Sequence, residues 1–218
     1  MQIGFLGGTG IEGKGLALRF AAAGATVVLG SRSEERAQAA AGEYNKLLGN
    51  SSILGMENGK MLAACDIVFL TVPYENAVAA IESCKSDFRA GQVLIDVTVP
   101  MAFREGRAEY VELETGSNSE LLARHIPEGV DLVAAFKTVP AHLLADLSSE
   151  LNCDIFVCGD SGKAREKVME AARMLPTLRP LDAGPLKIAR ILERMTVLAV
   201  NLNRRYKKKG ARYRIEGL

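Results

Sequence analysis

The chain lacks the long apolar runs that a membrane protein needs. Its longest unbroken apolar runs are short, such as Leu132–Phe136 and Val197–Val200. A membrane-spanning helix takes roughly 18 or more apolar residues. The N-terminus also lacks the charged region and the long apolar stretch of a signal peptide. We therefore expect a cytoplasmic protein that does not contact a membrane.

The chain is also poor in metal ligands. It has only two histidines, His125 and His142, and its four cysteines show no CxxC spacing: Cys65, Cys84, Cys153 and Cys158. Structural zinc sites need four clustered ligands, so we expect no metal site and buried, reduced cysteines. His125 is expected at the surface, and His142, close to a predicted turn, is the better-placed of the two histidines.

Net charge is nearly absent, at +1 over 218 residues. A total this small argues against a nucleic-acid-binding protein. The distribution is uneven, however, because residues 201–218 carry seven basic and one acidic side chain, while the rest of the chain carries 20 basic and 25 acidic ones. A solvated basic tail is the favoured interpretation. The alternative is that the tail attracts an anionic ligand.

Apolar strands alternate with helices along the chain. The predicted strands are 2–6, 25–29, 66–72, 93–97, 132–136, 154–157 and the short segment 178–181, and the predicted helices are 14–23, 75–84, 162–175 and 185–206. Continuous apolar strands are typical of a parallel sheet with both faces covered. We predict an α/β fold, a Rossmann-type doubly wound parallel sheet with a small C-terminal α/β extension ending in a long helix. The irregular stretch 101–116 is expected to be a lid or a solvated loop.

A glycine-rich turn joins the first predicted strand to the first predicted helix. Gly8, Gly10 and Gly13 have GxGxxG spacing within a strand–turn–helix unit, the context that distinguishes a dinucleotide fingerprint from an ordinary turn. We expect Gly8 to permit the tight turn, Gly10 to leave room for the pyrophosphate, and Gly13 to let the helix pack on the strand. The N–H groups at the start of the helix would then face the phosphates.

The residues after the second strand favour NADP over NAD. An NAD-selective site usually places Asp or Glu there, but this chain reads Gly-Ser-Arg-Ser at 30–33. A guanidinium binds a 2′-phosphate bidentately and a serine hydroxyl can donate to it, whereas a carboxylate would repel it. We therefore assign Ser31, Arg32 and Arg36 to the phosphate. The alternative is that both arginines are solvated and that Ser33 only caps the next helix.

Thr-Val-Pro occurs three times, each time at the end of a predicted strand: Thr71–Pro73, Thr98–Pro100 and Thr138–Pro140. Proline cannot donate to a ladder, so it ends a strand. Ligands of open parallel sheets bind beyond the carboxyl ends of the strands. We therefore expect the first and third of these turns to wall the nicotinamide end of the crevice, while the case for Pro100 is balanced.

The chain has no obvious catalytic acid. No tyrosine is followed by lysine at YxxxK spacing. Lys137, in the third of these turns, is either a solvated group or a cation that faces the ligand. The chain also has no room for the large helical substrate domain of hydroxyacid and imine reductases. A reaction that needs only two flat rings held face to face would need neither that domain nor an acid.

Taken together, these motifs resemble the NADPH-dependent coenzyme F420 reductases (F420H2:NADP oxidoreductases). The matching stretches cover essentially the whole chain: 7–10, 13–17, 30–32 with Arg36, 66–73, 138–141, 158–160, 178–186, 203–206 and 217–218. The Rossmann part is shared with many dehydrogenases. The motif at 182–186 and the compact C-terminus are more specific to this family.

The resemblance implies hydride transfer between NADPH and C5 of an 8-hydroxy-5-deazaflavin, with NADP and coenzyme F420 as cofactors, in a homodimer. Residues 1–141 would form the NADP-binding Rossmann domain, and 142–218 would complete the acceptor site and the dimer interface. The family usually carries His or Asn where this chain has Lys137, which is the one residue considered for catalysis. The predicted cofactor-binding residues are Gly8, Thr9, Gly10, Ile11, Gly13, Ser31, Arg32, Arg36, Thr71, Val72, Pro73, Lys137, Val139 and Pro140.

Two alternatives remain open at this point. One is an NADP-dependent reductase of another flavin, or of a small carbonyl or imine, with Lys137 as the acid. The other is a non-catalytic NADP(H) sensor. For the F420 reductase and for the other NADP-dependent reductase, the expected partner is a small-molecule redox acceptor. We expect no nucleic acid and no membrane as partners. Membrane-bound metalloreductases share a similar N-terminal domain, but they need spans that this sequence lacks.

Overall fold

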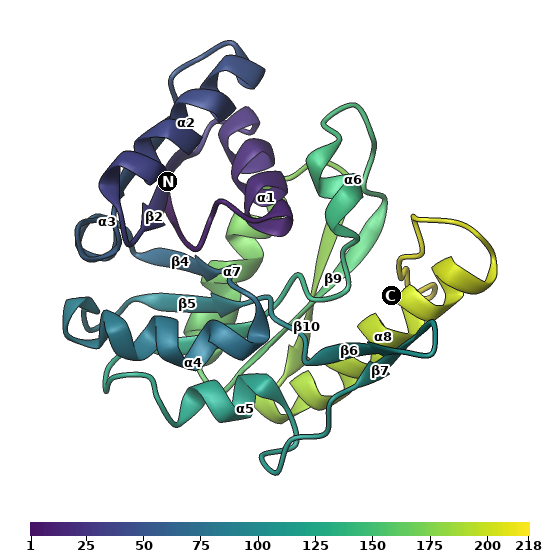
Figure 1. Cartoon of the computed structure of the whole chain (residues 1–218). Coiled ribbons are helices and arrows are strands. Elements are labelled where there is room, and N and C mark those ends of the chain that lie inside the picture. The colour runs from purple at the N-terminus through teal and green to yellow at the C-terminus, as the bar shows by residue number, and fades with distance from the viewer.

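One eight-stranded sheet forms the centre of the molecule (Figure 1). The computed structural model describes residues 1–218, except for the side chains of Ile11 and Glu12. The strand order is β10-β9-β8-β5-β4-β1-β2-β3, and every neighbouring pair is parallel except β8 with β9. The strands are β1 (Gln2–Leu6), β2 (Thr26–Ser31), β3 (Ile53–Glu57), β4 (Ile67–Leu70), β5 (Val93–Asp96), β8 (Asp131–Ala134), β9 (Cys153–Gly159) and β10 (Leu178–Gly184).

Helices cover both faces of this sheet. One face carries α1 (Ile11–Ala22), α2 (Glu34–Leu48), α6 (Ala141–Ala145) and α7 (Gly162–Arg173). The other face carries α3 (Asn58–Ala64), α4 (Tyr74–Ser83), α5 (Asn118–Ala123) and α8 (Ala189–Arg205). Each face has its own apolar core. The Rossmann-type doubly wound fold with a C-terminal α/β extension and a long final helix is therefore confirmed.

Aromatic and aliphatic side chains of the strands explain why the sheet forms here. Phe5 of β1 stacks on Phe69 of β4 with ring centroids 5.0 Å apart, and Phe20 of α1 packs against Phe69 at 5.4 Å. Such pairs add to the free energy gained by burying the rings. At the start of α2, Ser33 accepts a hydrogen bond from the Arg36 N–H at 3.3 Å. The predicted cap is therefore confirmed.

Several local expectations are wrong. The stretch 101–116 is not irregular throughout, because it contains the hairpin of β6 (Met101–Arg104) and β7 (Arg107–Tyr110). The amide of Asn201 on α8 binds this hairpin through the backbone N–H and C=O of Ala108, at 2.9 and 2.8 Å. The sheet is also not wholly parallel, since β9 runs antiparallel to β8.

Besides the hairpin, strand β3 and helices α3, α5 and α6 are absent from the predicted elements, and the last helix begins later than expected. Strand β3 and helix α3 follow α2 directly, and β3 is an edge strand in which only Ile53 is buried. An edge strand of this kind has no continuous apolar run to reveal it. The last helix begins at Ala189, after a single 3₁₀ turn at Leu186–Ile188.

The C-terminal tail returns to the edge of the sheet. Arg179 donates two hydrogen bonds to the Asp154 carboxylate, both 2.8 Å long, and the Asp154 N–H donates to the Tyr213 carbonyl at 2.8 Å. The Tyr213 hydroxyl donates to the Met195 carbonyl on α8 at 2.6 Å. The backbone of the tail is therefore part of the fold, although the basic side chains of 207–209 remain exposed.

The remaining expectations concern single side chains. All four cysteines are buried and unpaired, as predicted. His125 lies near the surface and bonds to Glu82 at 2.9 Å. No helix in the described structure is both long and apolar enough to cross a membrane. Among the described side chains, no three His, Cys, Asp or Glu residues cluster closely enough to hold a metal ion.

Candidate functional site

The candidate site lies where the strand order of the sheet reverses. β1 is paired with β2 on one side and with β4 on the other, so that Leu6 lies opposite both Gly30 and Leu70. The chain leaves these strands at the same edge of the sheet, which brings the glycine loop close to the turn after β4. In open α/β sheets this switch point is the usual place for a ligand.

The glycines of the loop have different roles, and one of them differs from expectation. The left-handed residue is Gly7, with φ +86°, so the tight turn is made one residue before Gly8. Gly8 is instead needed for packing, since a Cβ there would lie 2.8 Å from the Phe5 Cβ. A Cβ on Gly13 would lie 2.8 Å from the Gly8 Cα, in agreement with the predicted close packing of helix on strand.

Gly10 is the glycine whose missing side chain leaves open space. A Cβ built there meets only the Thr71 carbonyl oxygen, at 3.8 Å. Gly10 is also the N-cap of α1 and offers no side chain to the first N–H groups of that helix. The helix start is therefore open to an anion, as a pyrophosphate requires. Thr9 is exposed beside it, and the side chain of Ile11 lies outside the described residues.

A buried polar atom at the start of α3 lies beside Gly30 of β2. The Asn58 Oδ1 atom is buried and has no hydrogen-bond partner among the described residues. It lies 2.9 Å from the position that a Gly30 Cβ would occupy. A buried acceptor without a partner is costly, and this oxygen is the one such side-chain atom among the described residues. The open space at Gly10 fits the dinucleotide that the fingerprint implies.

The charged residues after β2 divide into two groups. Arg32 and Arg36 are exposed, and neither forms an ion pair with any described side chain. The nearby acids are engaged elsewhere, because Glu34 pairs with Lys60 at 2.6 Å and Glu35 accepts from the Ser33 hydroxyl at 2.6 Å. The carboxylates thus belong to the helix start, and the guanidinium groups remain available to a phosphate.

The three Thr-Val-Pro turns converge on one pocket. Its volume is about 370 Å³, within the range of small-molecule sites. It is lined by Val72 and Pro73 after β4, by Val97, Thr98 and Val99 after β5, and by residues 137–141 after β8. Neither Thr71 nor Pro100 is part of the lining. The Thr71 hydroxyl donates to the Leu6 carbonyl at 3.2 Å. We call this pocket the crevice.

Helix α8 closes the crevice from the other side, through residues that the sequence analysis did not name. Thr196, Ala199, Val200 and Asn203 recur at helical spacing and line the pocket together with Ala211 of the tail. The 3.6-residue periodicity could have shown that these residues share one face. It could not show which ligand-binding turn that face meets, because this depends on the path of the whole sheet.

Lys137 is buried and does not expose its ammonium to the crevice. Its side chain is only 1% exposed, and its Nζ lies 2.7 Å from Asp96 Oδ2 and 2.6 Å from the Thr98 carbonyl. The expectation of a solvated lysine is therefore wrong. Burial alone would lower the pKa of Lys137, but attraction by Asp96 and by Glu193 outweighs it, so the pKa is raised. The lysine stays protonated and held in place.

His142, unlike Lys137, does not line the crevice. It lies on α6, is exposed, and is absent from the pocket wall. Partial burial and the positive charge of Lys209 lower the pKa of His142. The C-terminal loop lies beside α6, since a Cβ on Gly210 would lie 3.8 Å from Leu143 Cδ1. In Figure 1 the yellow loop after α8 indeed lies next to α6.

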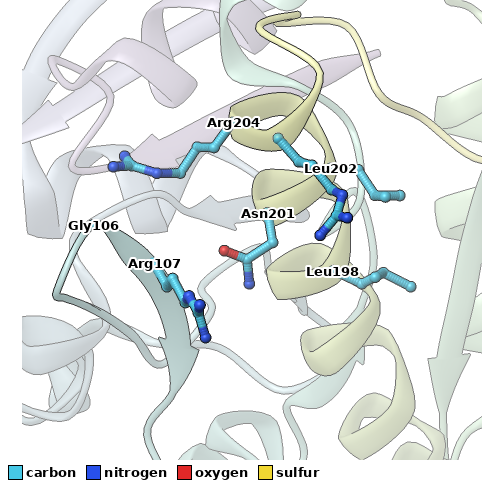
Figure 2. A pocket seen from close by; sticks show the side chains of 7 residues that line it. Gly106, Arg107, Leu198, Asn201, Leu202 and Arg204 are labelled. Atoms are coloured by element: carbon cyan, nitrogen blue, oxygen red, sulfur yellow. The ribbon is translucent and has the colours of Figure 1, made fainter.

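A second, larger hollow lies on the opposite face of α8. It measures about 830 Å³, and it is bounded by the hairpin and the outer side of the helix. Figure 2 shows Asn201 reaching from the helix toward the hairpin, with Arg107 and Arg204 nearby. Leu198 and Leu202 also border the hollow. It is separate from the crevice, since the two share no lining residue.

A Rossmann sheet with an open glycine loop at its switch point, next to a pocket shaped by three strand ends, defines the class of Rossmann-fold oxidoreductases. Residues 2–100 match the family described as NADP oxidoreductase, coenzyme F420-dependent. The chain is 38% identical to the F420-dependent NADP reductase of Methanothermobacter thermautotrophicus, covering 100% of this chain and 96% of the relative. The protein belongs to the F420-dependent NADP reductase family.

Further similarities agree with this assignment. The F420-dependent NADP reductase of Methanocaldococcus jannaschii is 35% identical, with 100% of this chain and 99% of the relative covered. The crystal structure of a putative F420-dependent NADP reductase from Arthrobacter sp. FB24 superposes with a TM-score of 0.81 over 98% of both chains. Its identity is 22%, so this likeness concerns the fold alone.

Proposed function

We propose that the protein transfers hydride between NADP(H) and the deazaflavin coenzyme F420. The observation that carries this proposal is the crevice, which lies between the turns that follow three strands and helix α8. Whole-chain similarity to F420-dependent NADP reductases supports the same activity. The proposed partner is therefore a small redox molecule and not a nucleic acid. The buried, reduced cysteines suit a cytoplasmic protein.

The residues of the chain act by binding and orientation. When bound, NADP(H) and F420 would supply the hydride donor and acceptor. The loop at Gly8–Gly13 holds the pyrophosphate, Ser31 and Arg32 hold the 2′-phosphate, and the turns at Val72–Pro73 and Val139–Pro140 hold the nicotinamide. The apolar walls of the crevice exclude water. Effective molarity from such orientation is sufficient for large rate gains without a proton donor.

The two parts of the chain would divide this work. Residues 1–141 would bind NADP, and 142–218 would complete the acceptor site through α8. The strands of both parts belong to one sheet, so the division is one of function within a continuous core. The two cofactors would meet at the crevice, to which both parts contribute side chains.

Incubation of the protein with NADPH deuterated on one face of C4 tests the proposal. Coenzyme F420, a flavin and a panel of small carbonyl and imine compounds serve as acceptors. We expect stereospecific transfer of the label to F420 only. Reduction of a carbonyl or a flavin, but not of F420, would contradict the proposal. Tight NADPH binding without transfer to any acceptor would instead support a sensor.

The basic tail is expected to attract the anionic end of the acceptor. Lys208 and Lys209 border a hollow of about 390 Å³ that shares Asn203 and Ala211 with the crevice. Lys208→Ala/Lys209→Ala should raise the KM for F420 about three- to tenfold at low ionic strength, because long-range attraction is lost. Steady-state kinetics at low and high salt measure this.

Two controls test this prediction, one with an altered substrate and one with an altered protein. A deazaflavin without the phosphate and glutamate tail should show the same KM with both proteins. Lys163→Ala/Lys167→Ala removes two lysines from α7, away from the crevice, and should leave both KM values unchanged. If Lys208→Ala/Lys209→Ala and the parent have the same KM for F420 at low salt, the tail is only a solvated surface.

We also propose a homodimer formed through the outer face of α8. Ile191, Leu198 and Leu202 recur at helical spacing and are 57%, 52% and 37% exposed, so they form an apolar stripe next to the hollow of Figure 2. A stripe of this kind on a soluble protein is typical of an interface. Leu198→Glu should convert the dimer into a monomer in sedimentation velocity, because it would bury an unpaired charge. A monomeric parent protein would refute the proposal.

A further inference from the structure

Three buried charged side chains join the strand-end wall of the crevice to helix α8. Lys137 Nζ is 2.7 Å from Asp96 Oδ2 and 3.4 Å from Glu193 Oε1, and it donates to the Thr98 carbonyl at 2.6 Å. The side chains of Asp96 and Glu193 are 0% exposed. We call these residues the Lys137 cluster. Two N–H groups of the ammonium donate to Asp96 and to Thr98, and its charge is paired with Glu193, so the ammonium is held inside the cluster and is not directed at a substrate.

The carboxylates of the cluster are bound from several other elements. Asp96 accepts from the Ser119 hydroxyl at 2.6 Å. Glu193 accepts from the Tyr110 hydroxyl at 2.7 Å and from the Asn118 N–H at 3.1 Å. The cluster therefore holds together β5, β8, α5, α8 and the hairpin. With the ammonium gone, two buried carboxylates would face each other without a cation, which is strongly unfavourable.

The same residues form part of the two walls of the crevice. Thr98 and Lys137 line it from the sheet, and Thr196 lines it from α8. The Thr196 hydroxyl donates to the Lys137 carbonyl at 2.8 Å, so Lys137 binds α8 through both its backbone and its ammonium. Phe136 before it has φ +60°, a strained conformation for a bulky residue. This strain at the crevice is offset by the contacts that hold the turn.

We propose that Lys137 is a positioning residue, which acts through Glu193 and Thr98 to set the distance between the α8 wall and the strand-end wall. The inference rests on the proposed hydride transfer, because two rings held between these walls must approach closely. A shift of about 1 Å in such a reaction costs up to about a hundredfold in rate. Lys137 itself does not touch the reacting atoms through its ammonium.

Glu193→Gln is the main test, because it keeps the size of the side chain and leaves a neutral Lys137–Asp96 pair, so the fold should survive. We expect single-turnover hydride transfer at saturating F420 to slow by about ten- to a hundredfold. The Kd for NADPH, measured by fluorescence titration, should stay within about twofold, since the glycine loop is untouched. Amide hydrogen exchange along α8 should become faster.

Lys137→Met supplies a second and distinctive readout. At about pH 8 the hydride-transfer rate of Lys137→Met should be lower than that of Glu193→Gln. The rate should recover partly as the pH is lowered from about 8 to 6, because a buried carboxylate of the cluster then takes up a proton in place of the missing cation. The parent should show no such recovery. The matched control is Glu112→Gln, an exposed carboxylate that pairs with Arg194 on the outer side of α8, and it should match the parent in every measurement.

The outcomes separate the positioning role from the proposed activity. Unchanged exchange along α8 in Glu193→Gln, or an unchanged transfer rate, would overturn the positioning role. A loss of NADPH affinity in parallel with the rate would also overturn it, since this would mean a general disturbance of the fold. If the parent transfers no hydride to F420 while exchange along α8 still responds, the proposed activity fails and the structural tie stands.

Discussion

Gly10→Val is expected to weaken NADPH binding by about two orders of magnitude or more in a protein that remains folded. The backbone of Gly10 has φ −77° and ψ 168°, a conformation open to any residue. Its Cβ would meet no protein atom closer than the Thr71 carbonyl oxygen, at 3.8 Å. The valine would instead fill the space where we place the pyrophosphate. The loss of one or two charge-assisted hydrogen bonds there should weaken NADPH binding by about a hundredfold or more.

Stability distinguishes this variant from its neighbour in the same loop. Gly10→Val changes only an N-cap, so its Tm should fall by at most about 4 °C. In Gly13→Val the new Cβ would lie 2.8 Å from both the Gly8 Cα and the Thr71 hydroxyl, and overpacking should lower the Tm by about 4 to 10 °C. Calorimetry and a fluorescence titration of each variant measure the two effects. Retained NADPH affinity in Gly10→Val would place the nucleotide elsewhere.

Local chemistry explains what the sequence could predict. The glycine loop and the Thr-Val-Pro turns can be recognised from a few consecutive residues, because the missing Cβ of glycine and the missing N–H of proline affect the adjacent backbone. Even there the prediction was off by one residue, since the turn is made by Gly7 and not by Gly8. The sequence spacing identifies the loop, whereas the role of each glycine depends on which residues pack against it, such as Val72 against Gly7 and Phe5 against Gly8.

Long-range contacts explain what the sequence could not predict. Lys137 and Asp96 are 41 residues apart, and Glu193 joins them only because α8 crosses the ends of β5 and β8. A lone lysine at the end of a strand was therefore assigned either to solvent or to a ligand, and the structure places its ammonium among carboxylates. The hairpin at 101–110 was missed for a related reason. Only Ala108 on its strands is buried, so its stability comes from α8.

The preference for NADP depends on side chains whose partner is the ligand itself. Arg32 follows β2 at the switch point and is exposed, and the neighbouring glutamates are bound by Lys60 and Ser33. Arg32→Ala should weaken NADPH binding by about ten- to a hundredfold, the effect of one or two hydrogen bonds to a charged phosphate. NADH lacks the 2′-phosphate, so its affinity should not change.

Titrations of both nucleotides against matched variants decide this assignment. Arg36→Ala should lose less NADPH affinity than Arg32→Ala. Arg36 lies in the first turn of α2, where its backbone N–H is bound to Ser33, and is therefore farther along the chain from the end of β2 than Arg32. Arg173→Ala, whose guanidinium pairs with Glu166 at 2.7 Å on α7, is the control and should match the parent. The salt dependence of NADPH binding should also be shallower in Arg32→Ala, since one screened attraction is gone. An NADPH to NADH preference that stays the same in Arg32→Ala would assign the 2′-phosphate to another group.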